Sequence, residues 1–299
     1  MKIDKIIFAS SEEYSPFWNI QSRIWSTVFG IQPVLLLWGK VKNTDVSDTY
    51  GEVIEKNYST NSLKSLQMTW SKFVHVATEP NVTWMTGDID MFPLQTNYFV
   101  DNIKTIPDDF YSHLGYSLMA PYEEQDRWIK KGGLCTDRGG CDLVAYYHVA
   151  KGKTFDLVYD LGNGSLDDQV NRIMNTKKYG WARANKLSHE EVCQKIGHVP
   201  LPKEELPYWC SDENYTSDLL FDAKEKGKVN FEGRTYELYW FATRIDRPHW
   251  DRNLHSYRCD YSKLSRKEYI DFHAYPPPIV SFKEQEKSIR AILTVAGML

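Results

Sequence analysis

The fold is decided by the segment Val82-Thr83-Trp84-Met85-Thr86-Gly87-Asp88-Ile89-Asp90, in which a short apolar run leads directly into two aspartates. The apolar run is typical of a buried strand. In an extended segment residues i and i+2 project to the same face, so Asp88 and Asp90 can point at one ligand. Two close carboxylates repel unless a cation lies between them, and Mg²⁺ and Mn²⁺ prefer oxygen ligands. The segment predicts a metal-bridged diphosphate at a strand end, although acidic residues after a strand are more often solvated turn residues.

The chain before this segment alternates strand and helix signals. Apolar runs at 6–9 and 34–38 are typical of buried strands, and apolar residues recur at helical spacing over 13–29 and 63–77. This alternation predicts an α/β fold with a parallel sheet and helices on its faces. Ligands of such sheets bind at the carboxyl ends of the strands, which is where the two aspartates lie.

The second half of the sequence is less regular. It predicts helices over 142–150, 166–176 and from Lys283 onward, and strands over 116–120, 155–159 and 237–243. The glycine-rich stretch Gly132–Gly140 is expected to be a loop, either over the ligand or on the plain surface. No Pro/Ser-rich linker separates two parts, so we expect a single domain with an elaborated C-terminal part.

Composition excludes several classes of protein. The 299 residues carry 36 Lys and Arg against 40 Asp and Glu, a formal charge of −4 that argues against a nucleic-acid partner. The longest apolar run, Val34–Trp38, is far too short for a transmembrane segment, and Met1–Lys5 shows no secretory signal. Five cysteines with no C-x-x-C pair indicate reduced thiols. We therefore expect a cytoplasmic protein.

Three stretches together resemble a known family: 7–10, the 63–77 helix and Trp84–Pro93, which contains Asp-Ile-Asp-Met-Phe-Pro. They are similar to the GT-A class of nucleotide-sugar glycosyltransferases, and the chain is similar in style to those encoded by large algal viruses. The resemblance implies a Rossmann-like mixed sheet flanked by helices. It also implies a transferase with a DXD motif that moves a sugar, with manganese or magnesium, from a UDP-sugar to a glycan hydroxyl. Residues 1–95 would form the nucleotide-sugar half and 96–299 the acceptor half.

The resemblance also implies roles for individual residues. Asp88 and Asp90 match the metal and donor motif. The stretch Ala9-Ser10-Ser11 matches the loop that receives the base and ribose of the nucleotide. Lys64 and Lys72, on the helix before the motif, are candidates to face the pyrophosphate; the alternative is that they lie on the solvated face of an amphipathic helix.

Asp168 is the candidate general base of an inverting transfer, in which the acceptor hydroxyl must lose a proton as it attacks. Leu166-Asp167-Asp168 resembles the x-E-D signature of inverting members, with Asp in place of Glu and Asp167 as an acceptor or structural contact. The competing interpretation is a capping box, with Ser165 at the N-cap and Asp168 at N3.

A third metal ligand in similar enzymes is often a histidine near the C-terminal end of the chain. Two histidines are candidates here, His273 and His249, with chain order favouring His273. A lone histidine is usually a hydrogen-bonded structural residue. The nearby arginines that could clamp phosphate, or simply form a surface charge cluster, are Arg244, Arg247 and Arg252.

Three other functions compete with inverting transfer. A retaining glycosyltransferase would share the metal motif. A sugar nucleotidyltransferase would normally show a Gly-rich basic loop after the first strand, which this chain lacks. A catalytically inactive carbohydrate-binding protein would keep the aromatic residues but lose the metal carboxylates.

Aromatic residues make up 14% of the chain, including 10 Trp and 19 Tyr. Ring faces pack against sugar C–H groups, and Tyr and Trp add a polar handle, so aromatics outside the sheet core are expected to line the acceptor side. These residues are Tyr111, Tyr116, Tyr122, Trp128, Tyr146, Tyr147, Trp181, Tyr208, Trp209 and Trp250.

Overall fold

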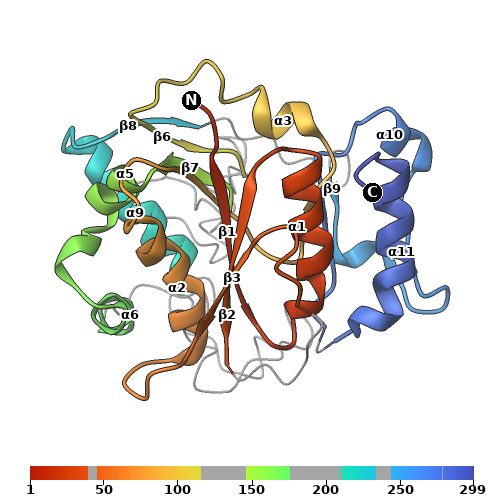
Figure 1. Ribbon diagram of the computed structural model, residues 1–299, viewed down its shortest axis with the longest axis horizontal. Coiled ribbons are helices and arrows are strands. Elements are labelled where there is room, and N and C mark those ends of the chain that lie inside the picture. The colour runs from red at the N-terminus through yellow and green to blue at the C-terminus, as the bar shows by residue number, and fades with distance from the viewer. Residues whose placement is uncertain (40–45, 116–145, 176–207, 209–210, 234–243, 278) are drawn as a thin grey trace, which may run out of the picture. The chain divides into compact units, whose positions relative to one another are not determined.

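The computed structural model describes residues 1–39, 46–115, 146–175, 208, 211–233, 244–277 and 279–299 (Figure 1). The chain divides into two compact units that interleave along the sequence. The first comprises Met1–Asn57, Gly87–Thr105 and Tyr239–Leu299, and the second comprises Tyr58–Thr86 and Ile106–Leu238.

The first unit contains a parallel three-stranded sheet in the order β3-β2-β1. Its strands β1 and β2 follow the two apolar runs of the sequence, while β3 arises from a polar stretch for which no strand was predicted. Helix α1 packs against β2 through a face that buries Trp18, Ile24 and Trp25. The elements are β1 (Lys5–Ser11), η1 (Ser15–Phe17), α1 (Trp18–Thr27), β2 (Gln32–Trp38) and β3 (Glu52–Lys56).

The rest of the first unit builds a small sheet beside the D-x-D segment. Its order is β5-β12-β9, with β12 antiparallel to β5 and parallel to β9. This sheet joins the residues after Asp90 to the last part of the chain. The elements are β5 (Met91–Pro93), α3 (Thr96–Val100), β9 (Arg244–Ile245), η4 (Arg247–His249), β10 (Trp250–Asp251), β11 (Ser256–Tyr257), α10 (Tyr261–Ser265), β12 (Asp271–His273) and α11 (Phe282–Val295).

The second unit has a mixed sheet in the order β4-β7-β6-β8. Strand β7 is antiparallel to both β4 and β6, whereas β6 and β8 are parallel. Helices α2 and α5 contribute a core of aromatic rings that pack on one another, among them Trp70 and Phe73 of α2 and Tyr159 of α5. The elements are α2 (Lys64–Val76), β4 (Thr83–Thr86), β6 (Phe110–His113), β7 (His148–Lys151), α5 (Gly152–Tyr159), η2 (Leu161–Asn163), α6 (Leu166–Asn175), α9 (Ser211–Glu225) and β8 (Asn230–Gly233).

The predicted α/β class with a mixed sheet and flanking helices is confirmed, and two local predictions are wrong. The 142–150 stretch was expected to be a helix, but its described end enters strand β7, and the expected strand over 155–159 is helix α5. A short apolar run such as 155–159 fits either state, and packing decides between them. The predictions over 116–120, 132–140 and 237–243 lie outside the described residues.

The predicted sugar-facing role is wrong for four of the aromatic residues. Tyr111, Tyr146, Tyr147 and Trp250 are all buried. Large rings contribute strongly to a core, and here they do so. Tyr208 is half-buried, and the other five members of that set lie outside the described residues.

Among the helices of the described residues, none has both the length and the apolarity that a membrane crossing requires.

Candidate functional site

The D-x-D segment lies against strand β1. The backbone N–H of Gly87 donates to the carbonyl of Ile7 at 2.8 Å. A Cβ atom on Gly87 would lie 2.5 Å from Cε1 of Phe8, so glycine is required for this close approach. The glycine therefore allows the chain to pass close beside β1 immediately before Asp88 and Asp90.

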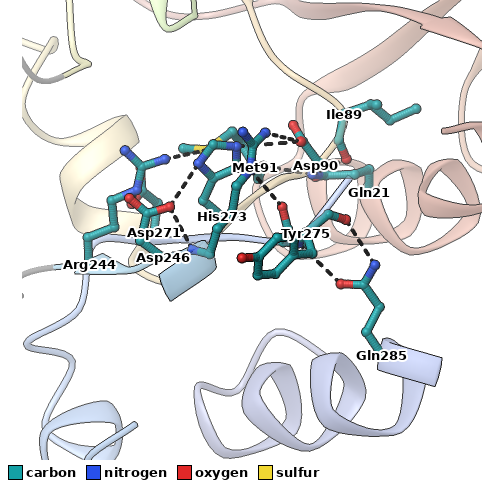
Figure 2. Close-up of polar contacts among 12 residues, drawn as sticks. Gln21, Ile89, Asp90, Met91, Arg244, Asp246, Asp271, His273, Tyr275 and Gln285 are labelled. Atoms are coloured by element: carbon teal, nitrogen blue, oxygen red, sulfur yellow. Dashed lines mark hydrogen bonds and ion pairs between the residues drawn. The ribbon is translucent and has the colours of Figure 1, made fainter. Parts of the chain in front are cut away.

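Gln21 fixes the backbone on both sides of Asp90 (Figure 2). This fully buried side chain of α1 donates from Nε2 to the carbonyls of Ile89, at 3.1 Å, and Met91, at 2.6 Å. Its Oε1 accepts from Nε1 of Trp25 at 3.2 Å. Buried amide groups that find all these partners restrict a segment to one conformation. Gln21 was not singled out from the sequence, because its partners lie about 70 residues away.

Strand β12 brings His273 beside Asp90. In the antiparallel pairing with β5, His273 lies opposite Met91, and the N–H of Ala274 donates to the Asp90 carbonyl at 2.9 Å. The Nε2 atom of His273 lies 3.4 Å from Oδ2 of Asp90. The predicted pair of Asp90 and His273 is therefore brought together by the small sheet.

The segment that follows His273 is anchored by α11. Buried Gln285 donates from Nε2 to the carbonyl of Tyr275 at 2.9 Å (Figure 2). The same Nε2 donates to the carbonyl of Val280 at 2.9 Å. The N–H of Tyr275 donates to the hydroxyl of Tyr257 at 2.6 Å. This network holds the backbone just after His273, so the imidazole is carried by a fixed strand end.

The Asp90 carboxylate is buried among cationic partners. Its side chain is 8% exposed, and Nη2 of Arg247 donates to its Oδ2 at 2.8 Å. Burial by itself would raise the pKa of the Asp90 carboxyl, but the charges and hydrogen bonds of His273 and Arg247 outweigh burial and hold that pKa well below its ordinary value. Asp90 is therefore ionised at neutral pH.

Asp246 fixes the orientation of His273. Its Oδ1 lies 3.0 Å from Nδ1 of His273 and accepts from the backbone N–H of Arg247 at 2.7 Å. Burial would raise the pKa of Asp246, yet His273 and Arg244 lower it well below the ordinary value. Because an ionised carboxylate only accepts, Nδ1 of His273 is the donor in this contact, and the ring turns Nε2 toward Asp90. A carboxylate behind an imidazole is the usual support of a metal-binding histidine.

The donor atoms suit a hard divalent cation, since a carboxylate oxygen and an imidazole nitrogen face each other and the imidazole has its supporting carboxylate. Asp88 is half-buried and belongs to the same unit. Across the described ranges, no three His, Cys, Asp or Glu side chains converge closely enough to hold a metal ion as they stand. Two of the three predicted ligands, Asp90 and His273, thus meet, and the complete set stays a prediction.

His249, the other candidate ligand, faces elsewhere. Its Nδ1 accepts from the backbone N–H of Asp246 at 3.0 Å as part of a capping box around η4. Of the three arginines, Arg247 contacts Asp90, Arg244 is buried beside Asp271, and Arg252 is exposed. Only Arg247 among these three is placed to contact a ligand of Asp90.

The stretch Ala9-Ser10-Ser11 lies within β1 and not in the loop after it, which corrects the predicted boundary. It pairs with Leu36–Trp38 of β2, and the Ser10 hydroxyl donates to the Ser11 carbonyl at 2.8 Å. The loop begins at Glu12 and leads to Tyr14, a residue that was not singled out from the sequence. Burial first, and then the charge of Asp90, raise the pKa of the Tyr14 hydroxyl, so it stays a neutral donor and acceptor beside the site.

Asp168 forms the capping box of α6 in the second unit. Its Oδ2 accepts from the N–H and the hydroxyl of Ser165, at 2.8 and 2.7 Å, and its N–H donates back to that hydroxyl at 3.2 Å. These hydrogen bonds to Ser165 lower the pKa of Asp168. The structural alternative for Asp168 is therefore confirmed, and its role as a base stays a prediction.

Asp167, its neighbour, is a structural contact. Its carboxylate accepts from the hydroxyls of Ser59, at 2.8 Å, and Ser62, at 2.6 Å, which lie just before α2.

The two candidate lysines differ in exposure. Lys64, at the start of α2, is exposed with Nζ 5.5 Å from the ring centre of Tyr58. Lys72 is only 2% exposed, so it does not lie on a solvated helix face.

No protein-family model matches this chain, and no curated protein matches it in sequence. Among solved structures the chain is similar to the galactosyltransferase LgtC in complex with donor and acceptor sugar analogues, at 12% identity, covering 99% of this chain and 96% of that chain, with a TM-score of 0.46. It is similar to the bifunctional glycosyltransferase WbbM at 9% identity, covering 91% of this chain and 45% of that chain, with a TM-score of 0.45. It is also similar to the glycosyltransferase GlyE of Streptococcus pneumoniae TIGR4, at 10% identity, covering 99% and 90%, with a TM-score of 0.31. Similarities of this size assign neither an activity nor a ligand to this chain.

Proposed function

We propose that this protein is a metal-dependent glycosyltransferase that moves a sugar from a nucleotide diphosphate sugar to a hydroxyl of a glycan acceptor. The donor that we propose is a UDP-sugar. The observation that carries the proposal is the meeting of the Asp90 carboxylate with Nε2 of His273, whose other nitrogen is held by Asp246. Sequence alone offers two aspartates in an ordinary motif. The supported histidine adds a second donor of the chemistry that Mn²⁺ accepts.

In this proposal Asp88, Asp90 and His273 hold Mn²⁺ or Mg²⁺. Such a cation, when bound, supplies Lewis-acid stabilisation of the leaving diphosphate. The chain's own contribution is to fix these donors, because Gln21 and Asp246 hold Asp90 and His273 in place before any ligand arrives. A cytoplasmic location and the absence of a nucleic-acid partner stay predictions from composition.

We propose that the transfer inverts the configuration of the anomeric carbon, with Asp168 as the general base. Retention is the alternative, and the capping box of α6 favours it, because a carboxylate with a lowered pKa that already accepts two hydrogen bonds is a weaker base. An Asp168→Asn variant tests the role of Asp168 as the base, and the anomeric configuration of the product distinguishes inversion from retention. Inversion expects transfer to fall by about 10²–10⁴-fold with donor binding unchanged, whereas a pure cap expects near-normal transfer because Asn keeps an acceptor oxygen.

The function is tested with a thermal-shift screen of nucleotide sugars, each with and without Mn²⁺, followed by product analysis with candidate acceptors. A donor present at 100 times its Kd stabilises the folded state by about 2.7 kcal/mol. The stabilisation should need Mn²⁺ and should vanish in Asp90→Asn. The matched control is Asp101→Asn, which removes an exposed carboxylate of the same unit. Full transfer in the presence of a chelator would exclude the metal-dependent reaction.

A further inference from the structure

Arg247 occupies the oxygen of Asp90 that faces His273. Oδ2 of Asp90 accepts from Nη2 of Arg247 at 2.8 Å, and the same Oδ2 lies 3.4 Å from Nε2 of His273. A cation held by Asp90 and His273 would have to approach this oxygen. The guanidinium and the cation therefore compete for one atom.

The backbone of Arg247 is fixed, and its side chain is partly exposed. Its backbone N–H donates to Asp246 at 2.7 Å, at the start of η4, and its Nε donates to the carbonyl of Ala274 at 3.2 Å. The side chain is 36% exposed, in contrast to the 8% of Asp90. A side-chain rotation that moves the guanidinium away from Asp90 also breaks the contact of Nε with the Ala274 carbonyl, while the backbone contact with Asp246 is kept.

Electrostatic repulsion makes the two cations compete for Asp90. Like charges at ion-pair distances in a partly buried site repel strongly. Conversely, a buried carboxylate is costly when it loses a cationic partner, so release of Arg247 from Asp90 is unfavourable unless another cation takes its place. Exchange of one cation for the other keeps the site neutralised throughout.

We propose that Arg247 is the resident counter-cation of Asp90, which a divalent cation must displace, and that the displaced guanidinium then binds the diphosphate of the donor. This inference rests on the proposed function. Arg247 weakens the binding of cation alone, because its ion pair with Asp90 must break first. A diphosphate gives the guanidinium a new bidentate partner, so cation and diphosphate bind with positive coupling.

The decisive measurement is the affinity of the full chain for Mn²⁺ alone, from the free-ion signal in electron paramagnetic resonance. Arg247→Gln removes the competing charge, and we expect it to bind Mn²⁺ about tenfold more tightly than the unaltered protein, the loss of one charge-assisted contact. The matched control is Arg290→Gln, which makes the same change of charge in an exposed pair on α11 and should leave the affinity unchanged. Asp90→Asn should abolish the binding in either background.

The second measurement adds UDP, with its own affinity for free Mn²⁺ subtracted. In the unaltered protein UDP should tighten Mn²⁺ binding more than it does in Arg247→Gln, because the variant has no guanidinium to release. If Arg247→Gln does not fold, the test uses the unaltered protein, and Arg247→Lys serves only to identify the signal of Arg247. The Nε–H signal of Arg247 in nuclear magnetic resonance, identified by its absence from Arg247→Lys, must then shift on addition of Mg²⁺ alone.

Two results overturn the inference, and they differ in what else they remove. Equal or weaker Mn²⁺ binding by Arg247→Gln, with binding still lost in Asp90→Asn, shows that Arg247 only braces the site, and the proposed function stands. If neither the unaltered protein nor Arg247→Gln binds Mn²⁺ at millimolar concentration, both the inference and the proposed metal site fail.

Discussion

Two arginine–aspartate pairs start from arginines only three residues apart and have very different surroundings. Arg244 and Asp271 join β9 to β12 at 3.2 Å with side chains 3% and 0% exposed. Arg247 and Asp90 meet at 2.8 Å, but the arginine is 36% exposed. Burial of both partners makes a pair a permanent part of the core, because either charge left alone is costly. Exposure of one partner leaves it able to exchange its contact.

The largest expected effect is from breaking the buried pair. Asp271→Asn leaves the Arg244 charge buried and should lower the free energy of unfolding by about 3–5 kcal/mol. Denaturant unfolding measures this change. The matched control is Glu286→Gln in an exposed pair of α11, expected to change stability by about 0.5 kcal/mol or less. A loss below 1 kcal/mol in Asp271→Asn would remove the distinction between the two pairs.

An intermediate effect is expected at the carboxylate behind His273. Asp246→Asn keeps an N-cap residue for η4, since Asn caps as well as Asp, but removes the charge that orients and polarises the imidazole. Mn²⁺ affinity should fall by about 10–100-fold, the usual effect of losing such a supporting group. Calorimetric titration with Mn²⁺ gives the affinity, and the melting temperature shows whether the turn is intact. Unchanged affinity would mean that Asp246 serves η4 alone.

The smallest effect is expected on stability when the partly exposed pair is changed. Asp90→Asn should alter the free energy of unfolding by about 1 kcal/mol or less, because the Arg247 side chain is partly exposed and the amide can still accept its hydrogen bond. The same denaturant experiment applies, side by side with Asp271→Asn. A loss as large as that of Asp271→Asn would show that Arg247 and Asp90 form a structural pair, and the comparison would collapse.

The local sequence pattern predicted the helices and strands in which apolar residues recur with one clear spacing. The strands at 6–9 and 34–38, the helices at 63–77 and 166–176, and the terminal helix after Lys283 all agree with the structure to within a few residues. Strand β3 was missed because Glu52–Lys56 has only two apolar residues, Val53 and Ile54, among three charged ones, and lies at a sheet edge. Helix α5 was mistaken for a strand because its apolar cluster is short. Its start is fixed by packing, since a Cβ on Gly152 would lie 2.3 Å from the carbonyl oxygen of Val76.

The site was predictable only in part, for a related reason. Asp90 and His273 were chosen by residue type and family resemblance, and they do meet. Gln21 and Asp246 were missed because their roles come from contacts that span long stretches of sequence. The sequence of 246–248, Asp-Arg-Pro, does indicate a capped turn. Nothing local indicates that the capping carboxylate also holds His273.

The pairing of β5 with β12 has a consequence for the order in which the site can assemble during synthesis of the protein. His273 is synthesised roughly 180 residues after Asp90, a delay of about 10–40 s at ordinary rates of translation. During that interval neither the imidazole nor Arg247 has left the ribosome. Gln21, by contrast, is made before the acidic segment and is available to bind the carbonyls of Ile89 and Met91 at once. The nascent chain can therefore shape the acidic loop first and add its cationic partners last.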